Sequence, residues 1–169
     1  MAIKDALLPE FDQEMATTRK VLERLPSDKF DWKPHETSMP LGRLAAHVAT
    51  LNEWLVQTLK RDAFDVEPLD GEPWRMPEFK TTDELVAGFD ALAAEARAAL
   101  AVASDEHLLA AWSLLKGGQT VFSMPRIVSI RSFIFNHLIH HRGQLSVYLR
   151  MNGVPVPSIY GPSADEGAF

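Results

Sequence analysis

The 169-residue sequence contains no cysteine, and this absence excludes several kinds of chemistry. A disulfide framework, a thiolate metal site and a cysteine nucleophile all require the missing side chain. The absence is also compatible with a reducing compartment, so we expect a cytoplasmic protein.

An excess of positive charge and long apolar runs are missing as well. The 17 Lys and Arg residues are outnumbered by 23 Asp and Glu, and the net charge is −6. Nucleic-acid binders usually carry a basic patch, whereas the basic residues here are scattered, so no nucleic-acid partner is expected. No apolar run approaches the length of a membrane span, and the charged N-terminus does not resemble a signal peptide. We therefore expect no membrane partner.

Common nucleotide-binding and nucleophile motifs are also absent. The sequence has no Gly-rich phosphate loop and neither a Ser-x-x-Lys nor a Gly-x-Ser-x-Gly motif. Gly117-Gly118 is a turn signal only. The sequence alone therefore identifies no catalytic residue and no residue that recognises an organic cofactor.

The composition that remains is that of a globular protein, with 46% hydrophobic and 24% charged residues. This length and composition predict a single domain over residues 1–169. Apolar residues recur at helical spacing in four segments, which are residues 3–25, 38–60, 81–100 and 123–152. We therefore expect an all-α fold, a four-helix bundle with long connections. A small hairpin is compatible with the glycine pair inside residues 111–122.

Capping signals mark several ends of these helices. Ser38 fits an N-cap with Pro40 in the first turn, and Thr81 to Glu84 fits a capping box. Asn152 and Gly153 form a natural stop for the last helix.

The most informative residues are histidines on the apolar stripes. His137 and His141 are four residues apart, so on a helix they lie above one another on one face and can reach the same metal ion. His47 occupies the apolar stripe of the second segment. Three histidines that converge from two helices would leave coordination positions open, as a catalytic metal requires.

A structural role competes with this interpretation. A single histidine on an apolar face is more often a hydrogen-bonded core residue than a ligand, although the i,i+4 pair makes the two readings about equally strong. Leu138 stands where a zincin motif would need glutamate. His140 is rotated by about 100° from His141 on a helix, so it is not expected at the same ion. His35 and His107 lie in polar surroundings and are expected at the surface.

Several motifs together resemble those of the DinB-like superfamily, the DinB and YfiT-like metalloenzymes. The most specific stretch is HLIHHRGQLSVYLR at residues 137–150, followed by Gly153 and by PSIYGPSADE at residues 157–166. The segments DWKPH, SMPLG and LAAH, which begin at Asp31, Ser38 and Leu44, resemble the start of the second helix in that family.

The resemblance implies a homodimeric four-helix bundle in which His47, His137 and His141 hold a divalent metal. Relatives include S-transferases and isomerases that use low-molecular-weight thiols such as bacillithiol, mycothiol or glutathione. The family resemblance thus favours a metal-dependent, thiol-dependent S-transferase-like enzyme that acts on a small-molecule substrate.

Two alternatives stay open at this point. One is a metal-dependent hydrolase that uses metal-bound water, and the other is a non-enzymatic metal-binding bundle. Three imidazoles suit several divalent ions, among which we prefer Zn or Ni, with Fe or Mn as alternatives.

Overall fold

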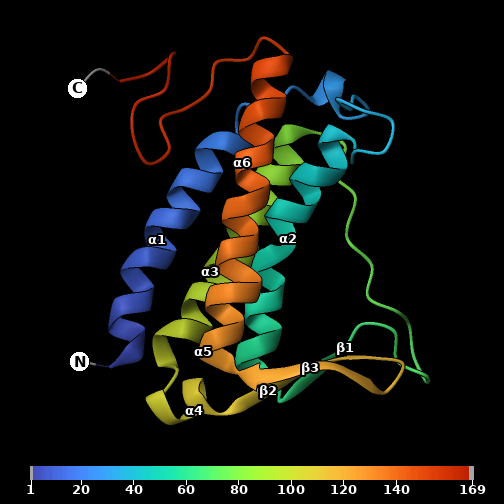
Figure 1. The fold of residues 1–169 in the computed structure, drawn as a ribbon, viewed down its shortest axis with the longest axis vertical. Coiled ribbons are helices and arrows are strands. Elements are labelled where there is room, and N and C mark those ends of the chain that lie inside the picture. The colour runs from blue at the N-terminus through green and yellow to red at the C-terminus, as the bar shows by residue number, and fades with distance from the viewer. Residues whose placement is uncertain (1, 168–169) are drawn as a thin grey trace.

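The computed structural model describes residues 2–167, and helices dominate it. Four helical segments lie along the long axis of the molecule (Figure 1), namely α1 (Ile3–Leu22), α2 (Leu41–Lys60), α3 (Thr82–Val102) and α6 (Asn136–Met151). The last of these continues directly from α5 (Arg126–Val128) and from a π-helical segment, η2 (Ser129–Phe135). The shorter helices are η1 (Ser27–Lys29) and α4 (Asp105–Leu109).

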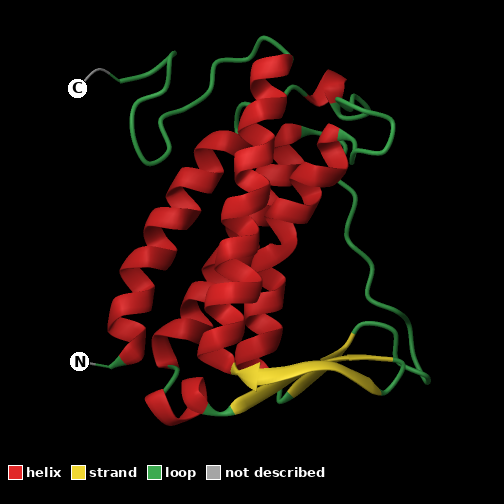
Figure 2. Cartoon of the chain, viewed as in Figure 1, coloured by secondary structure: helices red, strands yellow, loops and turns green. Residues whose placement is uncertain are grey.

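A three-stranded sheet closes one end of the helices (Figure 2) and shows that the predicted all-α four-helix fold is wrong. The strands are β1 (Ala63–Asp65), β2 (Ala111–Lys116) and β3 (Gln119–Pro125). β2 is central, parallel to β1 and antiparallel to β3, so the sheet is mixed.

The sheet depends on a local turn between β2 and β3 and on a long-range pairing between β1 and β2. The hairpin forms because Gly117 and Gly118 both adopt positive φ, at 59° and 73°, as a tight two-residue hairpin turn requires. β1 is only three residues long and pairs with a strand some fifty positions later, so the sequence near it carries no period-two pattern that would reveal it.

Apolar stripes explain the helical layer. The buried residues of the four long segments form one continuous cluster, which includes Phe11, Leu44, Phe89 and Leu145. A second, smaller cluster consists of the strand residues Phe64, Trp112 and Leu114. These pack against helical residues that include Trp54 and Phe133. Among residues 2–167, no helix combines the length and the apolar character that a membrane crossing would require.

The observed helix ends agree in part with the capping signals. The Thr81 hydroxyl accepts a hydrogen bond from the Glu84 backbone N–H at 3.2 Å, which confirms this N-cap. The Glu84 carboxylate, however, accepts from the Lys80 N–H rather than closing a capping box on Thr81. Ser38 is not the N-cap of α2, because the helix begins at Leu41 directly after Pro40.

Candidate metal centre

The site lies between α2 and α6, which run antiparallel. The start of α2 and the end of α6 are tied together where the Tyr148 hydroxyl donates to the Met39 carbonyl at 3.2 Å. Trp32 packs edge-on against the Tyr148 ring at the same place, with 5.5 Å between ring centroids. This pairing of the helices brings the second turn of α2 opposite the first two turns of α6.

His47 from α2 meets His137 and His141 from α6. The Nε2 atoms of His47 and His137 are 3.1 Å apart. The three ring centroids are separated by 4.6 to 4.8 Å. One nitrogen can be chosen from each ring so that all three lie within 4.8 Å of one another. The structure thus brings together the three histidines that the sequence singled out.

These nitrogens fit a divalent ion with little rearrangement. Two nitrogen ligands on a tetrahedral zinc ion lie about 3.4 Å apart when each bond is about 2.1 Å long. The 3.1 Å separation of the His47 and His137 nitrogens is already close to that value. Among the described residues no carboxylate joins the cluster, so the donor set is three imidazoles, which Zn, Ni and Fe all accept.

Burial keeps His47 and His137 in the neutral form that binds metals. Desolvation, together with the neighbouring His137, His141 and Arg43, lowers the pKa of His47 to about 4. Desolvation and His141 also lower the pKa of His137, although a hydrogen bond with the Phe133 backbone acts in the opposite direction. Both rings are therefore neutral near pH 7, with a lone pair free for an ion.

Gln144 supplies a partner that orients His141. Its Oε1 lies 2.7 Å from Nδ1 of His141, so this ring nitrogen is the donor and Nε2 is left to face the cluster. The Gln144 amide nitrogen lies 3.2 Å from Nε2 of His140. The i,i+3 spacing of His141 and Gln144 was a signal for this contact that the sequence reasoning overlooked.

The π-helical segment η2 ends at the residue before α6 and therefore lies immediately under the site. Its wider turns change the rotation of the chain just ahead of His137, and such turns often occur at functional sites. Phe133 in this segment packs against the His137 ring at a centroid distance of 5.9 Å. No proline or glycine marks the segment, so the sequence pattern gave no warning of it.

The other histidines lie outside the cluster, as expected. His35 and His140 are exposed. His107 is not a free surface residue, because its Nε2 lies 2.8 Å from the Leu59 carbonyl and joins α4 to the end of α2.

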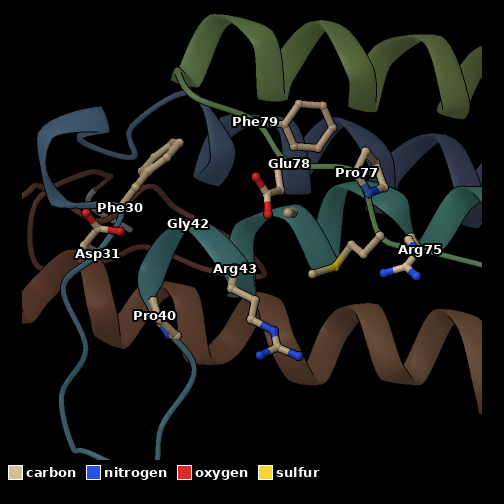
Figure 3. Close-up of a pocket in the computed structure, with 11 residues that line it drawn as sticks. Phe30, Asp31, Pro40, Gly42, Arg43, Arg75, Pro77, Glu78 and Phe79 are labelled. Carbon is tan, nitrogen blue, oxygen red and sulfur yellow. The ribbon is translucent and has the colours of Figure 1, made fainter.

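Aromatic side chains border the cluster, and a pocket opens one helical turn away along α2. Trp54, two turns after His47, packs edge-on against Phe133 and Trp74, with ring centroids 5.7 and 5.2 Å apart. One turn before His47, Arg43 lines a pocket of about 640 Å³ (Figure 3) that also contacts Ala46. This volume is in the range that holds a small molecule.

This combination of a helical layer, an end sheet and a three-histidine cluster defines a class of helical proteins with a candidate metal site. The DinB family model matches residues 1–168, and the chain belongs to the DinB family. The uncharacterized protein YrdA of Bacillus subtilis is 30% identical over 166 residues, which cover 97% of this chain and 92% of YrdA.

Solved structures with the same fold come from two Bacillus species. A DinB-like protein from Bacillus cereus superposes with a TM-score of 0.73 at 23% identity, covering 94% of this chain and 98% of that one. The DinB-like protein YjoA from Bacillus subtilis gives a TM-score of 0.69 at 20% identity, covering 90% of this chain and 96% of that one. At these low identities the similarity shows that the proteins share a fold and nothing further.

Proposed function

We propose that His47, His137 and His141 hold a divalent metal ion and that the protein is a metal-dependent enzyme of the thiol S-transferase type. The single observation that carries the metal site is the convergence of three imidazoles from two helices, with no carboxylate of the described residues among them. Zinc or nickel is the ion we favour, and the chemistry of the donor set also suits iron.

The chain's own residues prepare this site in three ways. Burial depresses the pKa of His47 and of His137, so that protons do not compete for the ligand nitrogens at neutral pH. Gln144 fixes the orientation of His141. The helices α2 and α6 are packed through a shared apolar core, which holds the three rings near their ligand positions before any ion arrives.

A metal ion at this position would lower the pKa of a thiol or a water molecule that reaches it. The chain has no cysteine, so a thiol must come from a separate small molecule. The pocket beside Arg43 and Ala46 offers space for one. The pocket would serve the substrate of either enzyme, and we favour the thiol-dependent reaction because the family resemblance does.

A cobalt-substituted sample tests the proposal. Addition of a small thiol, such as glutathione, should produce a new near-ultraviolet absorption band, because sulfur that binds cobalt gives an intense charge-transfer transition. The band should be absent in His137→Ala and present in His140→Ala, whose side chain lies outside the cluster. Cobalt binding without any spectral response to several thiols would instead support the hydrolase or the metal-binding bundle.

Assembly stays a prediction. The homodimer that the family resemblance implies would be detected by sedimentation at micromolar concentration, and a monomer there would contradict it.

A further inference from the structure

Two arginines line the pocket beside the histidine cluster without a carboxylate partner. Both arginines are exposed, whereas the buried Arg126 and Arg142 pair with Asp62 and Glu14. Within residues 2–167, no carboxylate lies within ion-pair distance of Arg43 or Arg75, although both side chains line the same pocket.

The position of Arg43 connects this pocket to the histidines. Arg43 precedes His47 by four residues on α2, so the two side chains share a face of the helix. Figure 3 shows the Arg43 guanidinium extending from α2 toward α6. Arg75, which belongs to the loop before α3, lies farther along α2. A ligand group held by Arg43 would therefore lie one helical turn from the histidine cluster.

The remaining walls of the pocket are suited to an apolar body. Phe30, Phe79 and Pro77 surround the space above α2 (Figure 3). Phe30 can lie close to the helix because Gly42 has no side chain, and a Cβ there would come within 2.8 Å of Phe30. The pocket thus offers both an apolar surface and two unpaired guanidinium groups.

The charged side chains that line the pocket favour a carboxylate over a phosphate. Asp31 and Glu78 also line the pocket, so the four charged side chains sum to zero. A guanidinium fork matches both carboxylate and phosphate. Because two carboxylates are close by, a dianionic phosphate would be repelled more strongly than a singly charged carboxylate.

We propose that Arg43, assisted by Arg75, binds the carboxylate of a small molecule whose apolar part occupies this pocket, one helical turn along α2 from the histidine cluster. The proposal rests on the function proposed above for the cluster, which it deepens by naming a carboxylate-bearing ligand class. Arg43 acts here as a binding and positioning residue.

The test compares two probes of nearly identical shape, 3-phenylpropionate and its uncharged amide, on metal-free protein by titration calorimetry. The wild type should bind the carboxylate about tenfold more tightly than the amide, the preference that a charge-assisted hydrogen bond provides. Arg43→Gln should bring the two affinities close together, Arg43→Lys should retain part of the difference, and Arg75→Gln should reduce it less.

Arg61→Gln is the matched control. Arg61 is also an exposed arginine, at the opposite end of α2, where it stacks over Phe64 away from the pocket. Its replacement removes the same charge and should leave both affinities unchanged. If Arg61→Gln and Arg43→Gln reduce carboxylate binding equally, or if the wild type binds neither probe, the proposal is overturned.

The same titrations on zinc-loaded protein separate this proposal from the metal site. Carboxylate binding that needs zinc and ignores Arg43→Gln would overturn the arginine site and leave the metal proposal intact. Carboxylate binding that depends on Arg43 in a protein that takes up no divalent metal would support the arginine site and refute the proposed function.

Discussion

His141 and Arg142 are consecutive residues of α6, yet their side chains belong to two different polar clusters. Arg142 is almost completely buried and pairs with the buried Glu14 of α1, with 2.7 Å between Nη1 and Oε2. It also donates to the Thr18 hydroxyl at 3.1 Å and to the Tyr160 hydroxyl. Tyr160 in turn donates to the Glu14 carboxylate, which fixes the C-terminal segment against the helices.

The histidine cluster has the opposite chemistry. Its three members are all bases, they are only half-buried, and no acid among the described residues balances them. A buried charge is tolerated in a folded protein when partners satisfy it, as they do around Arg142. His47 and His137 instead have lowered pKa values and stay neutral near pH 7, and the three rings converge in an arrangement that a cation would complete. The first cluster stabilises the fold, and the second is organised for a ligand.

The largest effect that would sharpen this contrast is expected from Glu14→Ala. It leaves the Arg142 charge buried without its acid, which should lower the free energy of unfolding by about 3–5 kcal/mol. Urea denaturation measures this loss. Gln13→Ala, at the exposed neighbouring position, is the control and should change the free energy of unfolding by less than about 0.5 kcal/mol.

A second substitution shows whether the loss comes from the unpaired charge. The pair Glu14→Leu with Arg142→Met removes both charges and should recover much of the stability that Glu14→Ala loses, since an apolar pair of similar volume replaces the ions. If Glu14→Ala is as stable as the wild type, the buried ion pair does not have the role described here.

Acidification should affect the two clusters differently. Unfolded His47 titrates near 6.5 and folded His47 near 4, so between these pH values the unfolded chain binds more protons. The contribution of His47 to stability is thus fully present above pH 6.5 and is lost as the pH falls toward 4. In metal-free protein, His47→Gln should flatten the fall of the denaturation midpoint across this range. Identical pH profiles for variant and wild type would contradict the depressed pKa.

A smaller effect is expected from Gln144→Ala. The substitution removes the acceptor that orients His141, and loss of such a partner typically weakens metal binding by about tenfold or more. Competition with a chelating dye measures the zinc affinity. Gln144→Glu keeps an acceptor at the same place and should retain the affinity, whereas equal weakening in both variants would argue against this hydrogen bond.

The sequence predicted the helical layer well because each long helix buries a regular stripe. Phe11, Leu44, Leu85 and Leu145 lie on predicted stripes and are buried in the main core. The glycine pair indicated the β2–β3 hairpin, but the third strand was not predicted, since β1 is too short to show a pattern and its partner strand is distant in the sequence. The start of α2 was misplaced because Ser38 is a good capping residue that the chain does not use as one.

The sequence could predict which three histidines form the candidate site, but not which residues surround them. His137 and His141 share a helix face by spacing alone, and the apolar stripe of α2 directed His47 inward. The i,i+3 spacing of His141 and Gln144 could have indicated their contact within α6. Arg43 had no such signal, because its place in the pocket depends on which residues of the preceding and following loops pack against α2. The Arg142 network could not be predicted either, since Arg142 lies more than a hundred residues from Glu14 and Thr18 in the sequence.

The most direct measurement is the zinc content of untagged protein, by mass spectrometry, for the wild type and five single alanine variants. We expect one ion per chain in the wild type, in His140→Ala and in His107→Ala, whose side chains lie outside the cluster. His47→Ala, His137→Ala and His141→Ala should each lose most of the metal. A wild type that binds no divalent ion, or a His140→Ala that loses its zinc while His137→Ala keeps it, would contradict the three-histidine site.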